Sequence, residues 1–84
     1  MPDPEYHYVY ILASEVDPDR HYTGCTTDIV ERLAKHNRGQ VKHTSKHKPW
    51  RMETVIRFTS KRKARAFEAY LKSGSGREFS RRHF

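Results

Sequence analysis

The feature that most constrains this chain is an alternation of side chains, with a period of two residues, beyond its middle. A mainly apolar set alternates with a mainly charged set, namely Trp50, Met52, Thr54, Ile56 and Phe58 against Arg51, Glu53, Val55 and Arg57. Successive side chains of a β-strand point to opposite faces, so the pattern predicts a strand over residues 50–58 with one buried face. An isolated strand is not stable, so the chain must supply others to pair with it.

Two further strands are predicted near the amino terminus. Residues 6–13 are rich in aromatic and β-branched types, which favour strands. Their side chains would divide between two faces, with Tyr6, Tyr8, Tyr10 and Leu12 opposite His7, Val9, Ile11 and Ala13. Residues 15–19, rich in Asp and Pro, predict a turn. Residues 21–26 then predict an antiparallel strand, in which Gly24 marks a close approach or a bulge.

A helix is predicted next, with Thr27 as its N-cap and Asp28 in its first turn, where the helix dipole favours negative charge. It should extend to about Arg38 and end at Gly39. Its apolar stripe should consist of Val30, Leu33 and Ala34, with Ile29 beside them. Glu31 and Lys35 should form an exposed ion pair.

Two more helices should follow the third strand. Ser60 is the expected N-cap of a helix that reaches about Ser73, and Ser75 that of a short helix ending near His83. Residues 39–49 have no apolar periodicity and predict a basic loop. The order ββαβα(α) predicts an α+β fold, a small three-stranded, mostly antiparallel sheet flanked by helices. The length of 84 residues predicts one domain, residues 1–84.

Charge is divided unevenly along the chain, whose net charge is +7. Residues 1–31 hold one base and seven acids, whereas residues 32–84 hold sixteen bases and three acids. This division predicts a strongly positive face that attracts a polyanion, with nucleic acid as the expected partner. An anionic membrane is the rival, but it would favour a basic amphipathic helix with bulky apolar residues opposite, and no segment shows one clearly.

Three sequence features predict the cellular compartment: the length of the apolar runs, the character of the first residues and the number of cysteines. No apolar run approaches the roughly 20 residues needed to cross a bilayer, and residues 1–5 do not resemble a secretory signal. Cys25 is the only cysteine, so an internal disulfide is excluded. These features predict a soluble cytoplasmic protein, and they leave its oligomeric state open.

Glu68 is the first candidate for chemistry. Its apolar neighbours at helical spacing are Ala64, Phe67 and Leu71. Glu68 therefore lies at the edge of the core-facing stripe, where a carboxylate must be paired or must bind a cation. Taken alone, an ion pair with Lys72 or a contact with Arg65 is the better explanation.

Four other polar side chains are candidates on similar grounds. Arg32 and His36 lie four residues apart on one helix flank, where an arginine can bind phosphate and a histidine can transfer a proton near neutral pH. Tyr10 and Tyr22 lie on the first two strands. Taken singly, the helix pair is an exposed basic flank and the tyrosines are packing residues.

Taken together, these residues resemble the signature of the GIY-YIG nuclease superfamily. Tyr8-Val9-Tyr10 and, after eleven intervening residues, Tyr22-Thr23-Gly24 are similar to the two motifs that name it. Arg32, His36 and Glu68 follow in the order in which that family keeps an arginine, often a histidine or tyrosine, and a metal-binding glutamate. The likeness covers essentially the whole chain, and its best match is to small stand-alone members described as predicted endonucleases.

The resemblance implies a metal-dependent endonuclease that hydrolyses phosphodiester bonds in DNA, structure-specific or non-specific, related to enzymes of DNA repair. Glu68 would hold one Mg²⁺ or Mn²⁺, and Arg32 would neutralise charge on the phosphate. Tyr10 is the first choice for general base, because a nearby cation and Arg32 would favour its phenolate. Tyr22 would orient the water or the phosphate, and His36 would be the alternative base or the partner of a tyrosine.

Flanking phosphates are expected to bind three groups of side chains. These are Lys42, His43, Lys46, His47 and Lys48 in the loop, Lys61, Arg62, Lys63 and Arg65 at the start of the later helix, and Lys35 on the first helix.

Some positions depart from the family pattern. Tyr8 stands where the first motif has glycine, and Thr23 where the second has isoleucine. The only asparagine is Asn37, in the first predicted helix, so the role of the family's late asparagine is vacant or taken by another residue. The alternatives are a nucleic-acid-binding module with weak or lost catalysis and a protein-interaction adaptor. A zinc site is disfavoured, because no cysteine–histidine set has structural-zinc spacing.

Overall fold

The computed structural model describes residues 5–84, and residues 1–4, part of the segment predicted not to be a signal peptide, lie outside this range. The elements in chain order are β1 (His7–Ser14), β2 (His21–Thr26), α1 (Ile29–Asn37), the short 3-10 helix η1 (Ser45–His47), β3 (Trp50–Phe58), α2 (Lys61–Lys72) and α3 (Gly74–His83). This is the predicted order, and it confirms the α+β class.

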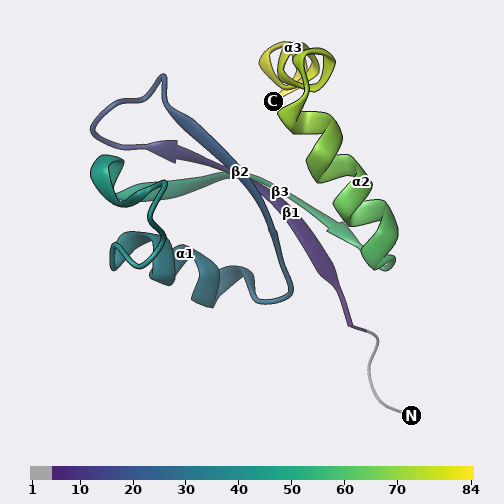
Figure 1. Ribbon diagram of the computed structural model, residues 1–84, viewed down its shortest axis with the longest axis horizontal. Coiled ribbons are helices and arrows are strands. Elements are labelled where there is room, and N and C mark those ends of the chain that lie inside the picture. Colours follow the sequence, from purple (N-terminus) through teal and green to yellow (C-terminus); the bar gives the residue numbers. More distant parts are fainter. Residues whose placement is uncertain (1–4) are drawn as a thin grey trace.

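The three strands form an antiparallel sheet in the order β2-β1-β3, with β1 at its centre. Helix α1 lies against one face of the sheet, and α2 lies against the other (Figure 1). The even-numbered residues of β1 belong to the core on the α1 side, and the odd-numbered ones to the core on the α2 side, as predicted for this strand. The α1-side core contains Tyr10, Leu12 and Trp50, and the α2-side core contains Val9, Ile11, Ala64 and Leu71.

Strand β3 carries a β-bulge that the alternation does not reveal. Ile11 pairs with Thr54, but the next residue, Leu12, pairs with Met52, so Glu53 is the extra residue. The side chains of β3 change face at this point. Met52 packs in the α1-side core, whereas Phe58 packs in the α2-side core. The predicted apolar set is the less exposed one along the whole strand, but the bulge divides it between the two faces of the sheet, so α1 covers one stretch of it and α2 covers the other.

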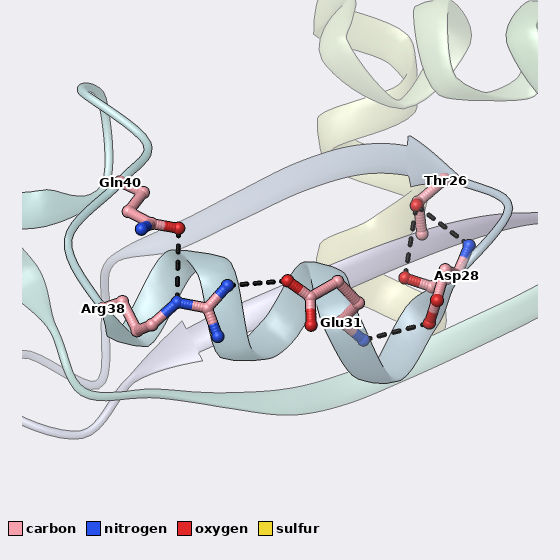
Figure 2. A network of polar contacts seen from close by, with 5 residues as sticks. All are labelled: Thr26, Asp28, Glu31, Arg38 and Gln40. Carbon is pink, nitrogen blue, oxygen red and sulfur yellow. Dashed lines mark hydrogen bonds and ion pairs between the residues drawn. The ribbon is translucent and has the colours of Figure 1, made fainter.

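Helix α1 begins one residue later than predicted. Asp28, not Thr27, is the N-cap, and its Oδ1 accepts a hydrogen bond from the Glu31 amide at 3.0 Å (Figure 2). The Asp28 amide in turn donates to Thr26 Oγ1 at 3.1 Å, which fixes the entry into the helix. Gly39 ends the helix as predicted, with a φ of 75°, a conformation that glycine adopts without strain.

The exposed and buried faces of α1 also differ from the prediction. Val30 is 78% exposed, and the stripe that faces the core consists of Ile29, Leu33 and the buried His36. Glu31 pairs with Arg38 at 2.6 Å instead of Lys35, and Arg38 also donates to Gln40 at 3.2 Å (Figure 2).

Helices α2 and α3 meet at a tight junction. Ser60 caps α2 as predicted, but Ser73, not Ser75, caps α3, and its Oγ accepts from the amide of Gly76 at 3.2 Å. Gly76 is buried against the last turn of α2, where a Cβ atom would overlap with the carbonyl of Tyr70. Within residues 5–84, no helix has the length and apolar character needed to cross a membrane.

Candidate active site

The phenol of Tyr10 lies over the backbone of Gly24. These residues are partners in the β1–β2 ladder, and Tyr10 is fully buried. A Cβ atom at position 24 would overlap with the phenol oxygen, so only glycine leaves space for this ring. The close approach predicted at Gly24 is confirmed.

A buried chain of hydrogen bonds leads from Tyr10 into helix α1. The Tyr10 hydroxyl lies 2.9 Å from Nε2 of His36, and Nδ1 of His36 lies 2.7 Å from Oγ1 of Thr44. Thr44 donates its hydroxyl proton to the carbonyl of Val41, so it accepts the Nδ1 proton of His36. Nε2 then holds the lone pair, and Tyr10 donates to it. Tyr10, His36 and Thr44 are each at most 1% exposed, and this chain satisfies their buried polar atoms.

The protonation of Tyr10 is controlled mainly by burial. Burial raises the pKa of Tyr10 to about 12, Tyr22 and Glu68 add to the rise, and Arg32 opposes it. Arg32 acts in the predicted direction, toward phenolate, but in the metal-free protein removal from water outweighs its attraction and the net shift of the pKa is upward. Burial also lowers the pKa of His36, with help from two nearby basic side chains, so its imidazole is neutral at neutral pH.

Tyr22 lies between this buried chain and the surface. Its ring centroid is 6.4 Å from that of Tyr10 and 5.0 Å from that of His36. Tyr22 is half-buried and lines an open groove. The ammonium of Lys72 lies 5.8 Å from the same ring centroid. Of the two candidate phenols, Tyr22 is therefore the one that faces solvent.

Glu68 reaches this region from α2. Its side chain is 21% exposed, and its Oε2 lies 3.1 Å from the ammonium of Lys72, so the ion pair that the sequence suggested is confirmed. Because the same ammonium lies over the ring of Tyr22, one cation links the carboxylate with the phenol. Glu68 is therefore partly shielded from solvent and is connected to Tyr22 through Lys72.

Arg32 completes the set from helix α1. It is half-buried and lies one turn before His36. After burial, its positive charge is the largest influence that lowers the pKa of His36, so its guanidinium lies beside the aromatic cluster. Elements β1, β2, α1 and α2 thus bring five of the predicted residues to one region, namely Tyr10, Tyr22, Arg32, His36 and Glu68.

The side chains in this region suit a hard divalent cation better than zinc. Glu68 would supply one carboxylate, and Tyr22, which lies beside the same ammonium of Lys72, has a phenol oxygen. A cation such as Mg²⁺ keeps several water ligands and takes others from a phosphate, so one protein carboxylate can suffice. Within residues 5–84, no group of three or more His, Cys, Asp or Glu side chains gathers as a transition-metal site would need.

The predicted phosphate-binding residues fall into two separated groups. The loop of residues 39–49 lies beside α1, whereas the start of α2 lies at the other end of the molecule (Figure 1). Their basic side chains are exposed except for His47, which is half-buried and packs edge-on to Trp50, with 6.4 Å between ring centroids. Within residues 5–84, none of the ten makes an ion pair.

Two polar residues near the site were not predicted to have a role there. Thr44 orients His36, but a single threonine in a polar loop carries no recognisable signal. Asn37 accepts from the amide of Trp50 at 2.6 Å and donates to its carbonyl at 3.0 Å, which joins α1 to β3. The only asparagine of the chain therefore has a structural task.

Comparisons with known proteins agree with this geometry. Residues 6–82 match the family model described as the GIY-YIG catalytic domain. The UPF0213 protein BH0048 of Halalkalibacterium halodurans is 40% identical over 73 residues, which cover 86% of this chain and 76% of that protein. The structure-specific endonuclease subunit SLX1 of Meyerozyma guilliermondii is 37% identical over 75 residues, which cover 81% of this chain but only 25% of that protein.

One solved structure is similar to this chain over most of the length of both. The solution NMR structure of the UPF0213 protein BH0048 from Bacillus halodurans superimposes with a TM-score of 0.55 at 36% identity, and the match covers 90% of this chain and 80% of that one. The resemblance first seen in the two tyrosine motifs is thus borne out by the family model, by curated relatives and by the fold. This chain belongs to the GIY-YIG nuclease family.

Proposed function

We propose that this protein is an endonuclease that hydrolyses phosphodiester bonds in DNA with the aid of one divalent cation, Mg²⁺ or Mn²⁺. The observation that supports this most is the convergence of a carboxylate, a guanidinium and two phenols from four elements. Family membership supports the reaction class, and the SLX1 relatives are named as structure-specific endonucleases. We expect this chain also to act on DNA by structure more than by sequence.

Glu68 would hold the cation, in place of its present contact with Lys72. When bound, such a cation polarises the phosphoryl oxygens and stabilises the leaving oxygen. Lys72 would then turn its ammonium to a phosphate of the same strand. One carboxylate is enough for this arrangement, because the substrate supplies the other anionic oxygens.

Tyr22 and Arg32 would contact the substrate directly. In the reaction, a water oxygen bonds to phosphorus and the bond from phosphorus to the leaving sugar oxygen breaks. The attacking water gives up its proton to solvent water, and the leaving oxygen takes up a proton from solvent to become a hydroxyl. Arg32 would neutralise charge on the non-bridging oxygens, and the Tyr22 hydroxyl would orient the water. Phosphoryl transfer with a loose transition state depends mainly on positioning and charge, so it asks little of a strong base.

Tyr10 and His36 would act through Tyr22 and not by contact with the substrate. Both are fully buried, and the hydroxyl of Tyr10 already donates to Nε2 of His36. Water cannot reach the phenol of Tyr10 in this arrangement, and burial disfavours its phenolate. We therefore assign these two residues to positioning, and this replaces Tyr10 as the first choice for general base.

Replacement of Glu68 tests this function. Parent and Glu68→Gln proteins should be incubated with supercoiled plasmid and with branched DNA in Mn²⁺, and the nicking rate measured. The isosteric amide cannot neutralise the cation, so the rate should fall by about 100-fold or more. Direct Mn²⁺ binding, followed by electron paramagnetic resonance, should weaken in parallel. Equal nicking by both proteins would reject the assignment.

The ion pair between Glu68 and Lys72 favours a second candidate function. A carboxylate that already has a cation does not require a metal, so a nucleic-acid-binding module without catalysis is consistent with this contact. That function predicts salt-sensitive DNA binding by the parent protein, with no nicking in Mg²⁺ or Mn²⁺ and no change of affinity in Glu68→Gln.

A further inference from the structure

An open groove of about 770 Å³ extends away from Tyr22 on the α2 side of the sheet. Ile11 and Leu71, two residues of the α2-side core, line it. Its volume lies within the roughly 300–1,000 Å³ of sites that hold a ligand of drug size. Lys72, at the edge beside Glu68, is the one residue of this lining to which the proposed function gives a phosphate contact, so the rest of the groove is left without an occupant.

The groove and the candidate active site share two residues. Tyr22 and Lys72 line the groove, and they also contact the aromatic cluster and Glu68. A polynucleotide whose phosphate lay beside Glu68 would have to continue in some direction from that point. The groove begins where that phosphate would lie, and so it offers a path for the adjoining nucleotides.

The two sides of the groove differ in charge. Helix α3 contributes Arg77, Ser80 and Arg81, while the sheet side contributes Asp19, from the turn between β1 and β2, and Glu53, from β3. Glu53 is paired with His21, which also lines the groove, and with Arg51. Within residues 5–84, Arg77 makes no ion pair, and Arg81 shares the carboxylate of Glu78 with Arg82. Guanidinium groups bind phosphate in a forked geometry, and carboxylates repel phosphate but accept hydrogen bonds from base amino groups.

This difference in charge determines how a strand of nucleic acid would be oriented in the groove. Its phosphates would face α3, and its bases would face the hairpin over the apolar side chains of Ile11 and Leu71. Tyr22 lines one end of the groove, and the side of its ring over which Lys72 lies would be the surface on which a base stacks. A duplex is too wide for such a space, because its two backbones lie on opposite sides of the paired bases.

We infer that the groove between α3 and the β1–β2 hairpin binds one or two nucleotides of single-stranded nucleic acid next to the phosphate held at Glu68. This inference rests on the proposed function for its direction of approach, but binding in the groove needs no catalysis. It assigns Arg77 and Arg81 to phosphate contacts and Tyr22 to a base contact as well. The protein would then prefer substrates with an unpaired flank beside the cleaved bond.

The test maps the contact without metal. Parent protein labelled with ¹⁵N should be titrated with a short oligodeoxythymidylate in the presence of EDTA. The amide signals of Thr23, Arg77 and Ser80 should shift, and a duplex of the same length should shift them less at equal concentration. Shifts confined to residues 42–48 would overturn the inference, and so would groove shifts caused by an acidic peptide but not by the oligonucleotide.

A matched pair of double variants tests the two arginines. Arg77→Gln/Arg81→Gln removes two guanidinium groups that line the groove. Arg38→Gln/Arg82→Gln removes two that do not, each of which is paired with an acid in the protein. Fluorescence anisotropy should show about tenfold weaker single-strand binding for the first variant and less than about twofold for the second. Equal losses would overturn the inference.

The two proposals can fail separately. If Glu68→Gln nicks DNA as fast as the parent while the oligonucleotide still shifts the groove amides, the catalytic assignment is lost and the groove assignment stands. If the oligonucleotide leaves those amides unmoved while Glu68→Gln abolishes nicking, the reverse holds. Should the arginine variant fail to fold by circular dichroism, the titration of the parent decides alone.

Discussion

At the scale of single residues, the centre of the molecule is a polar chain inside an apolar core. A phenol, an imidazole and a hydroxyl from Tyr10, His36 and Thr44 follow one another, and each is almost completely shielded from water. Such groups are tolerated in a core only when every donor meets an acceptor. This requirement fixes the tautomer of His36. Because the imidazole must stay neutral to accept from Tyr10, its protonation would destabilise the folded protein.

The pH dependence of folding should report on His36. Its pKa is lowered in the folded protein, mainly by burial, so as the pH falls below about 6.5 the unfolded chain binds a proton that the folded protein does not. The free energy of unfolding should therefore decrease from pH 7.5 to pH 5.5. In the His36→Gln variant this decrease of the free energy of unfolding with falling pH should be absent, although the variant is less stable than the parent.

Urea unfolding at several pH values measures this slope. His43→Gln, which removes an exposed imidazole from the loop, serves as the control for the loss of a histidine. Parallel slopes in the parent and in His36→Gln would show that the buried imidazole is not the group responsible.

The two tyrosines should differ in their effect on catalysis. Tyr22→Phe removes the hydroxyl of the half-buried tyrosine, and we expect its nicking rate to fall by about tenfold to a hundredfold. Tyr10→Phe leaves Nε2 of His36 without its donor, so we expect a loss of stability of about 1–3 kcal/mol and a smaller loss of rate. Nicking assays and urea unfolding on both variants check this. A larger rate loss in Tyr10→Phe would restore that phenol as the base.

At the scale of elements, the junction of α2 and α3 depends on one glycine. Gly76→Ala would place a methyl group against the carbonyl of Tyr70, and backbone must move to relieve the overlap. We expect a loss of about 1–3 kcal/mol. Gly74→Ala in the same helix meets nothing within 4 Å and should not lower stability. Thermal unfolding of the two variants makes the comparison, and equal midpoints would contradict it.

The elements could be predicted from sequence better than their ends and faces. Asp28 and not Thr27, and Ser73 and not Ser75, are the N-caps. The side chains of all four residues can accept a hydrogen bond from a backbone amide, so the backbone angles decide which of them caps the helix. Val30 points outward because the packing of His36 and Leu33 against the sheet sets the rotation of α1. A polar residue in the buried stripe cannot be recognised by a rule that counts apolar side chains.

At the scale of the whole molecule, positive charge lies at both ends of the long axis. The loop set and the α2 set are separated by the sheet (Figure 1), so one straight duplex would have to span the protein to meet both. The candidate site lies between them. Its five residues were predicted from the family resemblance. The ion pair of Glu68 with Lys72 follows from their spacing, but the contact of Lys72 with Tyr22 and that of Thr44 with His36 depend on how the layers pack.

The salt dependence of DNA binding should show whether the loop contributes. In the triple variant Lys42→Ala/Lys46→Ala/Lys48→Ala, the affinity for duplex DNA should fall regardless of sequence. The slope of log K against log salt should decrease by about 0.9 for each phosphate that the variant no longer neutralises. Arg20→Ala/Arg38→Ala/Arg82→Ala, whose guanidinium groups are paired within the protein, is the control. A slope unchanged from the parent would favour the adaptor alternative.

The extra residue at Glu53 has a consequence for how this small chain is held together. Because the side chains of β3 change face at this residue, the first half of the strand packs toward α1 and the second half packs toward α2. Loss of a single residue at this point would turn the indole of Trp50 away from the carbonyl of Thr44, to which it donates at 2.8 Å. One irregularity in one strand thus lets a three-stranded sheet serve as the shared wall of two hydrophobic compartments.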